Sequence, residues 1–307
     1  MPAPGAALEG GSLTSFPRGP VLVIVASALW GTVGVASKVL QGIENVPPLV
    51  VGFFRLAIAV PLLLVWCWAQ LSFSTFRFAG RDVLRIVALG GAMALYQVCY
   101  FRAVRDIGVA LATLITLCSA PVLVGVLATL TLKERITPRI AAALILGLTG
   151  AALLVGAPAR EGNPAGVASA LGSALAYATF VLCSRTLAHH HPGKIIVVGF
   201  GTGALFLMPF ALAADVTFGS WPPMAWGALI YMGLIPTALA YLLYFRGMRD
   251  THATQATLIT LTEPLTATIL AYALFRERLG AAAIAGALML MATWVVLLLT
   301  PREHPSV

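Results

Sequence analysis

Long apolar stretches follow one another along almost the whole chain, separated by short polar connections. Each stretch is close to the roughly 20 residues that an α-helix needs to cross the hydrocarbon core of a bilayer. Ten can be counted, at about residues 20–39, 47–69, 83–101, 108–131, 138–157, 164–184, 195–214, 223–245, 252–274 and 280–300. They are continuous rather than alternating, which excludes an outer-membrane barrel. The pattern therefore predicts an all-α integral membrane protein with ten transmembrane helices, since a helix pairs its own backbone groups in lipid.

Charged residues are scarce and gather at the ends of these stretches. Only 30 of the 307 residues are Lys, Arg, Asp or Glu, and 60% of the chain is hydrophobic. Of the 30, 28 fall in predicted connections or within about a turn of a span end, and Arg55 and Glu263 lie deeper. A soluble protein carries about a quarter of its residues charged, so soluble enzymes are excluded. The basic residues are also too scattered for a nucleic-acid surface.

The connections predict a topology without a soluble domain. Basic residues flanking the spans divide twelve to six when the N-terminus is placed inside, and such residues prefer the cytoplasm. We therefore expect an N-terminal tail at 1–18 and a C-terminal tail at 301–307, both cytoplasmic. About 20 apolar residues follow Arg18, more than a signal-peptide core contains, so we expect the first span to be retained.

The two halves of the chain repeat each other. Tyr100–Leu117 and Tyr244–Leu261 are identical at 11 of 18 positions, at an offset of 144 residues. The repeats are predicted at 19–158 and 162–300, with five spans each. Because five is odd, the second repeat enters the membrane from the opposite side, and the halves are inverted. Inverted repeats are the recurring plan of secondary transporters, which open a site near the bilayer midplane to each side in turn.

Several short motifs resemble a known family. They are Ala28-Leu29-Trp30-Gly31, Phe53-Phe54-Arg55, Pro121 in the fourth span, Glu263-Pro264, and the span ends Lys133-Glu134-Arg135 and Arg276-Glu277-Arg278. Together with the duplication, these motifs are similar to the drug/metabolite transporter superfamily, EamA type. The resemblance implies a basket-like bundle with a central cavity in a bacterial inner membrane. It also implies export of amino acids or related metabolites, as in YddG-like exporters.

Other functions stay open at this point. Other branches of the superfamily carry nucleotide sugars or triose phosphates, usually through more basic cavities, and a nucleoside or a drug is a further alternative substrate. One deep arginine argues against a doubly charged phosphate. A membrane-embedded lipid-modifying enzyme would need several acids or histidines at one depth, and here one acid lies within a span. We therefore expect a transporter that is not an enzyme.

Glu263 and Arg55 are the two deep charges. A carboxylate inside a span is costly and should face the bundle interior, a partner or water. Glu263 is a candidate for binding a substrate ammonium group or a coupling proton, or it is locked by neighbouring backbone donors or by Arg55. Arg55 either extends to the interface, holds a substrate carboxylate through two hydrogen bonds, or pairs with Glu263. Pro264 lacks an amide donor and is expected to free the carbonyl of Thr260.

Aromatic and polar side chains recur at equivalent places in the two halves. Residues three or four apart share a helix face, so each half carries a polar-tipped stripe that suits a cavity wall. For the residues nearest the span ends, an interface anchor is the alternative; for those in the first and sixth spans, helix packing is. The stripes contain Tyr96, Gln97 and Tyr100 in one half and Tyr241 and Tyr244 in the other, joined by Trp30 and Tyr177 from the first and sixth spans.

The remaining expectations concern flexibility, ligands and partners. Each proline inside a span interrupts a helix where bending is easy, so Pro121, Pro209, Pro236 and Pro264 are candidate flex points. We expect no cofactor and no metal, because adjacent His189, His190 and His191 cannot all face one ion in a regular element. The four cysteines lie within spans, and we expect them to be reduced and structural. The expected partners are the lipid bilayer and a small-molecule substrate, with no nucleic acid; the oligomeric state is left open, and a monomer is compatible with the pattern.

Overall fold

A computed structural model describes residues 18–43, 46–70, 78–156, 163–214, 221–275 and 280–298, and every regular element within these ranges is a helix. The predicted N-terminal tail at 1–18, apart from Arg18, the predicted C-terminal tail at 301–307 and the motif at 276–278 lie outside the described residues. The first repeat contains α1 (Arg18–Ile43), α2 (Pro48–Gln70), α3 (Gly80–Ile107), α4 (Val109–Leu132) and α5 (Pro138–Val155). The second contains α6 (Pro164–Thr186), α7 (Pro192–Leu212), α8 (Pro223–Gly233), the π-helical turn η3 (Leu234–Leu239), α9 (Ala240–Gly247), α10 (Ala253–Ile259), α11 (Thr262–Phe275) and α12 (Ala281–Leu298).

These elements make ten apolar spans. Within the described ranges, nine spans are long and apolar enough to cross a membrane, counting α8 with η3 and α9 as one and α10 with α11 as another. The tenth is the shorter apolar helix at Ala281–Leu297. Large apolar side chains such as Leu84, Leu130 and Ile145 are about 70% exposed on the outside of the bundle, as lipid-facing residues are. The structure confirms the predicted all-α membrane fold.

The predicted boundaries are close, and the third span shows the largest difference. It was expected at 83–101, whereas α3 extends over Gly80–Ile107. The charged residues near its end are helical, and Arg102 and Asp106, four positions apart, approach to 3.7 Å there. Gly108 alone separates α3 from α4, and its φ of 83° is a conformation that glycine adopts without steric cost.

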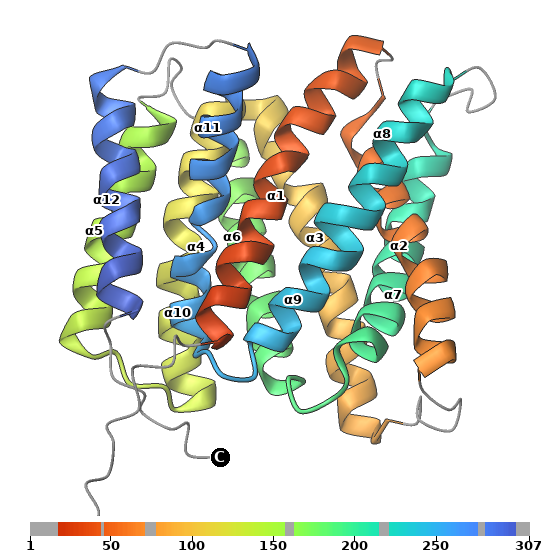
Figure 1. Cartoon of the computed structure of the whole chain (residues 1–307), viewed down its shortest axis with the longest axis horizontal. Coiled ribbons are helices and arrows are strands. Elements are labelled where there is room, and N and C mark those ends of the chain that lie inside the picture. The colour runs from red at the N-terminus through yellow and green to blue at the C-terminus, as the bar shows by residue number, and fades with distance from the viewer. Residues whose placement is uncertain are drawn as a thin grey trace, which may run out of the picture.

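The two repeats pack around a two-fold relation. In Figure 1, α5 stands beside α12 at one end of the bundle and α2 beside α7 at the other, and in each pair a helix meets its own counterpart. Other contacts between the repeats are reciprocal as well. Helix α3 packs on α6, and its counterpart α9 packs on α1; α4 packs on α6, and its counterpart α11 packs on α1. The two glycines of the α5–α12 contact are also reciprocal: a Cβ on Gly150 would lie 2.9 Å from the Gly286 carbonyl oxygen, and one on Gly286 would lie 2.5 Å from that of Gly150.

Local sequence signals mark where several helices begin. Prolines occupy the first turn of α5, α6, α7 and α8, where the missing amide costs no hydrogen bond. Thr137 caps α5 by accepting a hydrogen bond from the Ile140 amide at 3.3 Å, and Asn163 caps α6 by accepting one from the Ala165 amide at 3.0 Å. These caps place the connections that precede α5 and α6 outside the apolar spans.

Two spans of the second repeat are interrupted, and a proline lies in one interruption and shortly after the other. Pro236 lies in η3, and Pro264 follows the break between α10 and α11. The expectation of a free Thr260 carbonyl is wrong, because the Glu263 amide donates to it at 3.0 Å. The chain tightens into a turn at the break, and the donor that Pro264 lacks is supplied by the preceding residue.

The two faces of the bundle can be named from α1. We call the face where α1 begins the Arg18 side; it is the lower face in Figure 1. The loops between α6 and α7 and between α9 and α10 lie on this side, and α1 ends on the opposite side.

Candidate functional site

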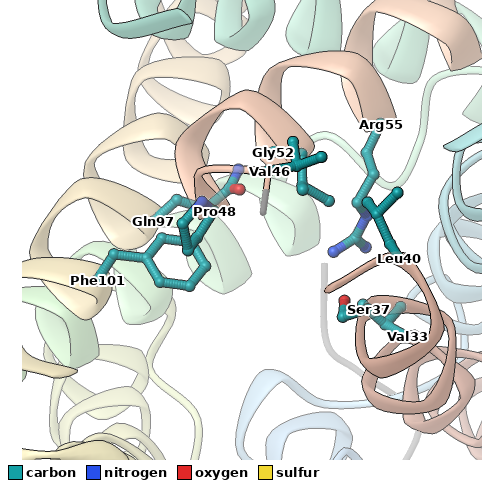
Figure 2. A pocket seen from close by; sticks show the side chains of 10 residues that line it. Val33, Ser37, Leu40, Val46, Pro48, Gly52, Arg55, Gln97 and Phe101 are labelled. Carbon is teal, nitrogen blue, oxygen red and sulfur yellow. The ribbon is translucent and has the colours of Figure 1, made fainter. Parts of the chain in front are cut away.

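A pocket opens between α1, α2 and α3 near the side opposite Arg18. Its volume is about 130 Å³, smaller than the roughly 300–1,000 Å³ of a drug-sized site. Figure 2 shows the Arg55 guanidinium pointing into the open space beside Ser37 of α1, with Gln97 and Phe101 of α3 across the pocket. The ten lining residues are Val33, Ser37, Leu40, Val46, Pro48, Val51, Gly52, Arg55, Gln97 and Phe101. Arg55 is the one charged residue among them, so its guanidinium is the charged group that the pocket presents.

The π-helical turn positions Arg55. Pro236 has no amide to give to the Met232 carbonyl, and the Thr237 hydroxyl donates to that oxygen instead, at 2.7 Å. The same hydroxyl accepts a hydrogen bond from Arg55 Nε at 3.2 Å. Within the described residues, this is the hydrogen bond that Arg55 makes, and the two terminal nitrogens stay available to the pocket. No ion pair with Glu263 is present in the described part of the chain, and the role of Arg55 in holding a substrate carboxylate stays a prediction.

Gln97 faces Arg55 across the pocket because α2 and α3 approach closely at a glycine. A Cβ on Gly52 would collide with the Gln97 side-chain amide, so the absence of a side chain at Gly52 leaves room for that amide. On the α1 side of the pocket, the Ser37 hydroxyl lies 3.8 Å from the Met232 sulfur. The pocket therefore presents an amide and a hydroxyl beside the guanidinium.

Glu263 lies in the first turn of α11, inside the Ala253–Leu274 span. A helix N-terminus carries partial positive charge, which stabilises a carboxylate there. Its side chain is exposed, and the groups that interact with it electrostatically are interior ones: the Arg55 guanidinium and four tyrosine hydroxyls, those of Tyr96, Tyr100, Tyr177 and Tyr241. The Glu263 carboxylate therefore lies near Arg55 and these tyrosines. Glu263 is not among the residues that line the Arg55 pocket.

The predicted tyrosines form an aromatic wall between the repeats. Tyr96 of α3 stacks on Tyr100, with ring centroids 6.1 Å apart, and lies 5.8 Å from Tyr177 of α6. The Tyr177 hydroxyl donates to Thr260 Oγ1 at 3.1 Å, at the break before α11. The Tyr100 hydroxyl is 2.7 Å from Thr113 Oγ1. Tyr100 is therefore tied to α4.

The counterparts on α1 and α9 are packed into the core. Trp30 lies 4.7 Å from Tyr241 and 5.3 Å from Tyr244 between ring centroids. Tyr244 is fully buried, so it neither lines the described pocket nor anchors the protein at the interface. Among the described residues, the Trp30 indole nitrogen and the Tyr244 hydroxyl are buried and have no hydrogen-bond partner, which is uncommon in a packed core. Phe180, which packs against Tyr241 and Tyr244, was not singled out from the sequence because an apolar residue in an apolar span carries no distinguishing signal.

The predicted flex points differ in their surroundings. Pro121 and Pro209 lie inside helices that continue through them, α4 and α7. Pro236 and Pro264 lie at the interruptions already described. Pro61 of α2 is a further proline inside a helix. Bending at any of these positions stays a prediction.

Polar contacts join the loops on the Arg18 side. Arg249 donates from Nε to the Ala188 carbonyl and from Nη2 to the His190 carbonyl, both at 2.9 Å. Arg185 donates to the carbonyls of Met248 at 2.6 Å and Arg249 at 3.0 Å. These bonds tie the α6–α7 loop to the α9–α10 loop. The repeat counterpart of Arg249, Arg105 on the opposite side, has a side chain that is 77% exposed and approaches only its neighbour Asp106, at 3.4 Å, among the described residues.

Glu134 of the first repeat contacts the second repeat on the same side of the bundle. Its carboxylate accepts hydrogen bonds from the Ala253 amide at 2.8 Å, the Thr254 amide at 3.3 Å and the Thr254 hydroxyl at 3.2 Å. It thereby caps the N-terminus of α10 from the α4–α5 connection. Burial alone would raise the pKa of the Glu134 carboxyl, but hydrogen bonds from His252 and from the two amides outweigh burial and hold that pKa below its ordinary value.

The three adjacent histidines separate. His189 and His190 turn toward Asp82 at the start of α3, whereas His191 packs against Trp66 with ring centroids 5.7 Å apart. Burial lowers the pKa of His191, and the positive charges of Arg246, Arg249 and Lys194 lower it further. Sequence reasoning missed Asp82 as a partner because 108 positions separate it from His190. Helix α6 ends at Thr186, and the turn that follows lets two neighbouring rings face one group.

Comparisons with known proteins agree with this architecture. The chain is 31% identical to the uncharacterized transporter YwfM of Bacillus subtilis over 93% of its own length and 95% of that protein. It is 30% identical to an uncharacterized transporter of Archaeoglobus fulgidus, covering 89% of this chain and 94% of that one. It is also 25% identical to the uncharacterized inner membrane transporter YicL of Salmonella typhimurium, covering 94% and 98% of the two chains.

A solved crystal structure shares the fold. It superimposes with a TM-score of 0.79 over 92% of this chain and 98% of the other, at 20% sequence identity. The profile of the EamA-like transporter family matches twice, at residues 17–156 and 164–299. The chain is therefore a membrane transporter that belongs to the EamA-like family of the drug/metabolite transporter superfamily.

Proposed function

We propose that this transporter exports amino acids or closely related small metabolites across a bacterial inner membrane. The observation that carries the proposal is the small pocket whose one charged lining residue is Arg55. A guanidinium with two terminal nitrogens available matches the two oxygens of a carboxylate. Ser37 and Gln97 add a hydroxyl and an amide for the polar groups that accompany a carboxylate in small metabolites.

Arg55 and Glu263 divide the proposed recognition. The Arg55 guanidinium holds the substrate carboxylate, and Glu263 receives a substrate ammonium group or a proton at another stage of transport. Glu263 is not among the residues that line the Arg55 pocket, so we assign its contact with the substrate to a different stage from that of Arg55. A rearrangement of the repeats would bring the bound molecule from one residue to the other.

Alternating access supplies that rearrangement. The pocket opens near one side, while Arg185, Arg249 and Glu134 close the Arg18 side. With both termini in the cytoplasm, as the basic residues predict, this arrangement faces outward. Arg105 is exposed, whereas its counterpart Arg249 donates hydrogen bonds to loop carbonyls. This asymmetry supports a cycle in which the two sides of the bundle close in turn.

Counterflow into proteoliposomes tests the proposal. Purified protein is reconstituted, the vesicles are loaded with one unlabelled compound, and entry of the same radiolabelled compound is measured against protein-free vesicles. The panel contains zwitterionic amino acids, nucleosides and sugar phosphates. We expect counterflow with at least one amino acid, whereas failure of every amino acid beside counterflow of a nucleoside or sugar phosphate would overturn the proposed substrate class.

A further inference from the structure

Three side chains with metal-binding atoms converge on the Arg18 side, away from the Arg55 pocket. They are Asp82 in the first turn of α3 and His189 and His190 in the α6–α7 loop, and their ligand atoms all lie within 4.8 Å of one another. His190 Nε2 is 2.9 Å and His189 Nε2 is 3.7 Å from the same oxygen, Asp82 Oδ2. Ligands around a tetrahedral zinc ion at about 2.0–2.1 Å stand roughly 3.3 Å apart, so the two observed separations bracket that spacing.

The His189 ring is oriented so that a lone pair faces the carboxylate. Its Nδ1 is 3.0 Å from the Thr186 carbonyl oxygen, which can only accept, so Nδ1 carries the hydrogen. In a neutral imidazole the other nitrogen is then an acceptor. His189 Nε2 and Asp82 Oδ2 would therefore both be acceptors across 3.7 Å. A cation between the two acceptor atoms would bind both of them. A metal-binding histidine usually donates its other ring N–H to a backbone carbonyl or a carboxylate, as His189 Nδ1 does here.

The surrounding groups hold the three ligands in place. Arg85 binds the other carboxylate oxygen, Asp82 Oδ1, at 2.9 Å and leaves Oδ2 for the histidines. Arg249 fixes the turn that carries both rings through the carbonyls of Ala188 and His190. The two rings lie 4.0 Å apart between centroids. His189 is 59% exposed, so an ion has access from solution and water can complete its coordination.

We propose that Asp82, His189 and His190 form a binding site for a divalent transition-metal ion such as Zn²⁺. Two imidazole nitrogens and one carboxylate oxygen suit Zn²⁺ or Ni²⁺, whereas Ca²⁺ requires six to eight oxygens and Mg²⁺ an octahedron of them. The ion would link α3 of the first repeat to the α6–α7 loop of the second. A bound Zn²⁺ would therefore strengthen the contact between the two repeats on the Arg18 side.

Zinc binding by the full-length protein tests the site directly, after removal of any polyhistidine tag. The protein in detergent competes with a chromophoric chelator for Zn²⁺, and the same preparation is titrated calorimetrically. We expect one strong site per chain, and a loss of affinity of at least about tenfold in His189→Ala and in His190→Ala. His191→Ala is the matched control, because the neighbouring ring packs against Trp66 and should leave the affinity unchanged.

The outcomes separate a metal site from a protonated histidine pair. Equal zinc affinity of the wild type and the His189→Ala variant would overturn the proposal, as would an equal loss in His191→Ala. Absence of strong zinc binding together with a protonated His189 at pH 7.5 by NMR would assign the cluster to a proton instead. Because Asp82→Asn also loses the Arg85 contact and can unfold, the exposed His189 is the primary variant. These readouts need no substrate, so they stand whether or not the proposed export of amino acids holds.

Discussion

The contact of Glu134 with α10 gives the sharpest prediction about closure. In Glu134→Gln one side-chain oxygen still accepts from the Ala253 amide, but the other becomes an NH₂ group that faces the Thr254 amide, a second donor. The variant loses a hydrogen bond to a charged group, worth about 1.5–3 kcal/mol. It also loses the interaction of a charge with a helix N-terminus, about 0.3–1 kcal/mol. Closure of the Arg18 side should weaken by about 2–4 kcal/mol, or at least about thirtyfold in the equilibrium between closed and open arrangements.

Pulsed electron spin resonance measures that equilibrium. Spin labels are attached at Arg135→Cys in the α4–α5 connection and at Arg246→Cys at the end of α9, two exposed positions on the Arg18 side. The four native cysteines, all free thiols, are replaced beforehand. The wild type should give mainly one distance, and Glu134→Gln should shift population to a longer one.

The control lies on the opposite side of the bundle. Asp106→Asn removes a carboxylate that approaches Arg102 and Arg105 there, and it should leave the Arg18-side distances as in the wild type. A distance distribution for Glu134→Gln that is indistinguishable from that of the wild type would refute the reasoning. Equal shifts in both variants would do so as well, because the effect would then follow from loss of any carboxylate.

Three further predictions use other features of the structure. Since the pKa of the Glu134 carboxyl is lowered, the contribution of Glu134 to closure is full above the ordinary carboxyl value of 4.5 and should be lost as the pH falls below that value. The same spin-label distances would show this change with pH, and its persistence in Glu134→Gln would contradict the assignment to Glu134. Thr237→Val removes the acceptor of Arg55 Nε and should weaken the apparent substrate affinity in counterflow by up to about tenfold, whereas Thr237→Ser should keep the wild-type affinity. Equal affinity in Thr237→Val and the wild type would show that Arg55 needs no such support. Gly150→Ala places a methyl group 2.9 Å from a backbone carbonyl oxygen and should lower the melting temperature in detergent, whereas Gly227→Ala, with nothing within 4 Å, should raise it slightly. A higher melting temperature for Gly150→Ala than for the wild type would contradict the close α5–α12 contact.

The spans and their inversion were predictable because both are local or periodic properties. A continuous apolar run of about 20 residues has few alternatives to a membrane helix, and the duplicated Tyr100–Leu117 motif is visible by direct comparison. The ends of α3 were not predictable from hydropathy. Arg102 and Asp106 look like loop residues in the sequence, but they approach each other within the helix and can extend to the membrane surface from its last turns.

The candidate site was predicted only in part. Arg55 and Gln97 could be found because a polar side chain inside a span is costly and therefore conspicuous. Ser37 could not, because a serine in a helix can satisfy its own hydroxyl on the backbone. The support of Arg55 by Thr237 depends on the π-helical turn around Pro236, a geometry that the sequence does not specify in advance.

The loops on the Arg18 side were the least predictable part. Their contacts join residues far apart in sequence, such as Glu134 with Ala253 and Arg185 with Met248. A charged loop residue normally has many solvated positions open to it. Only the tertiary packing, within the second repeat for Arg185 and between the repeats for Glu134, brings these side chains to particular carbonyls and amides, so no local sequence pattern predicts the contacts.

Recognition of a carboxylate by Arg55 is the central claim, and a matched pair of substrates tests it most directly. Counterflow is measured for an amino acid that the wild type transports and for the corresponding amide, which lacks the negative charge, in the wild type and in Arg55→Gln. The account predicts counterflow of the amino acid by the wild type, with little for the amide and little for either compound in Arg55→Gln. Equal counterflow of the acid and its amide by the wild type, or full activity of Arg55→Gln with the acid, would contradict it.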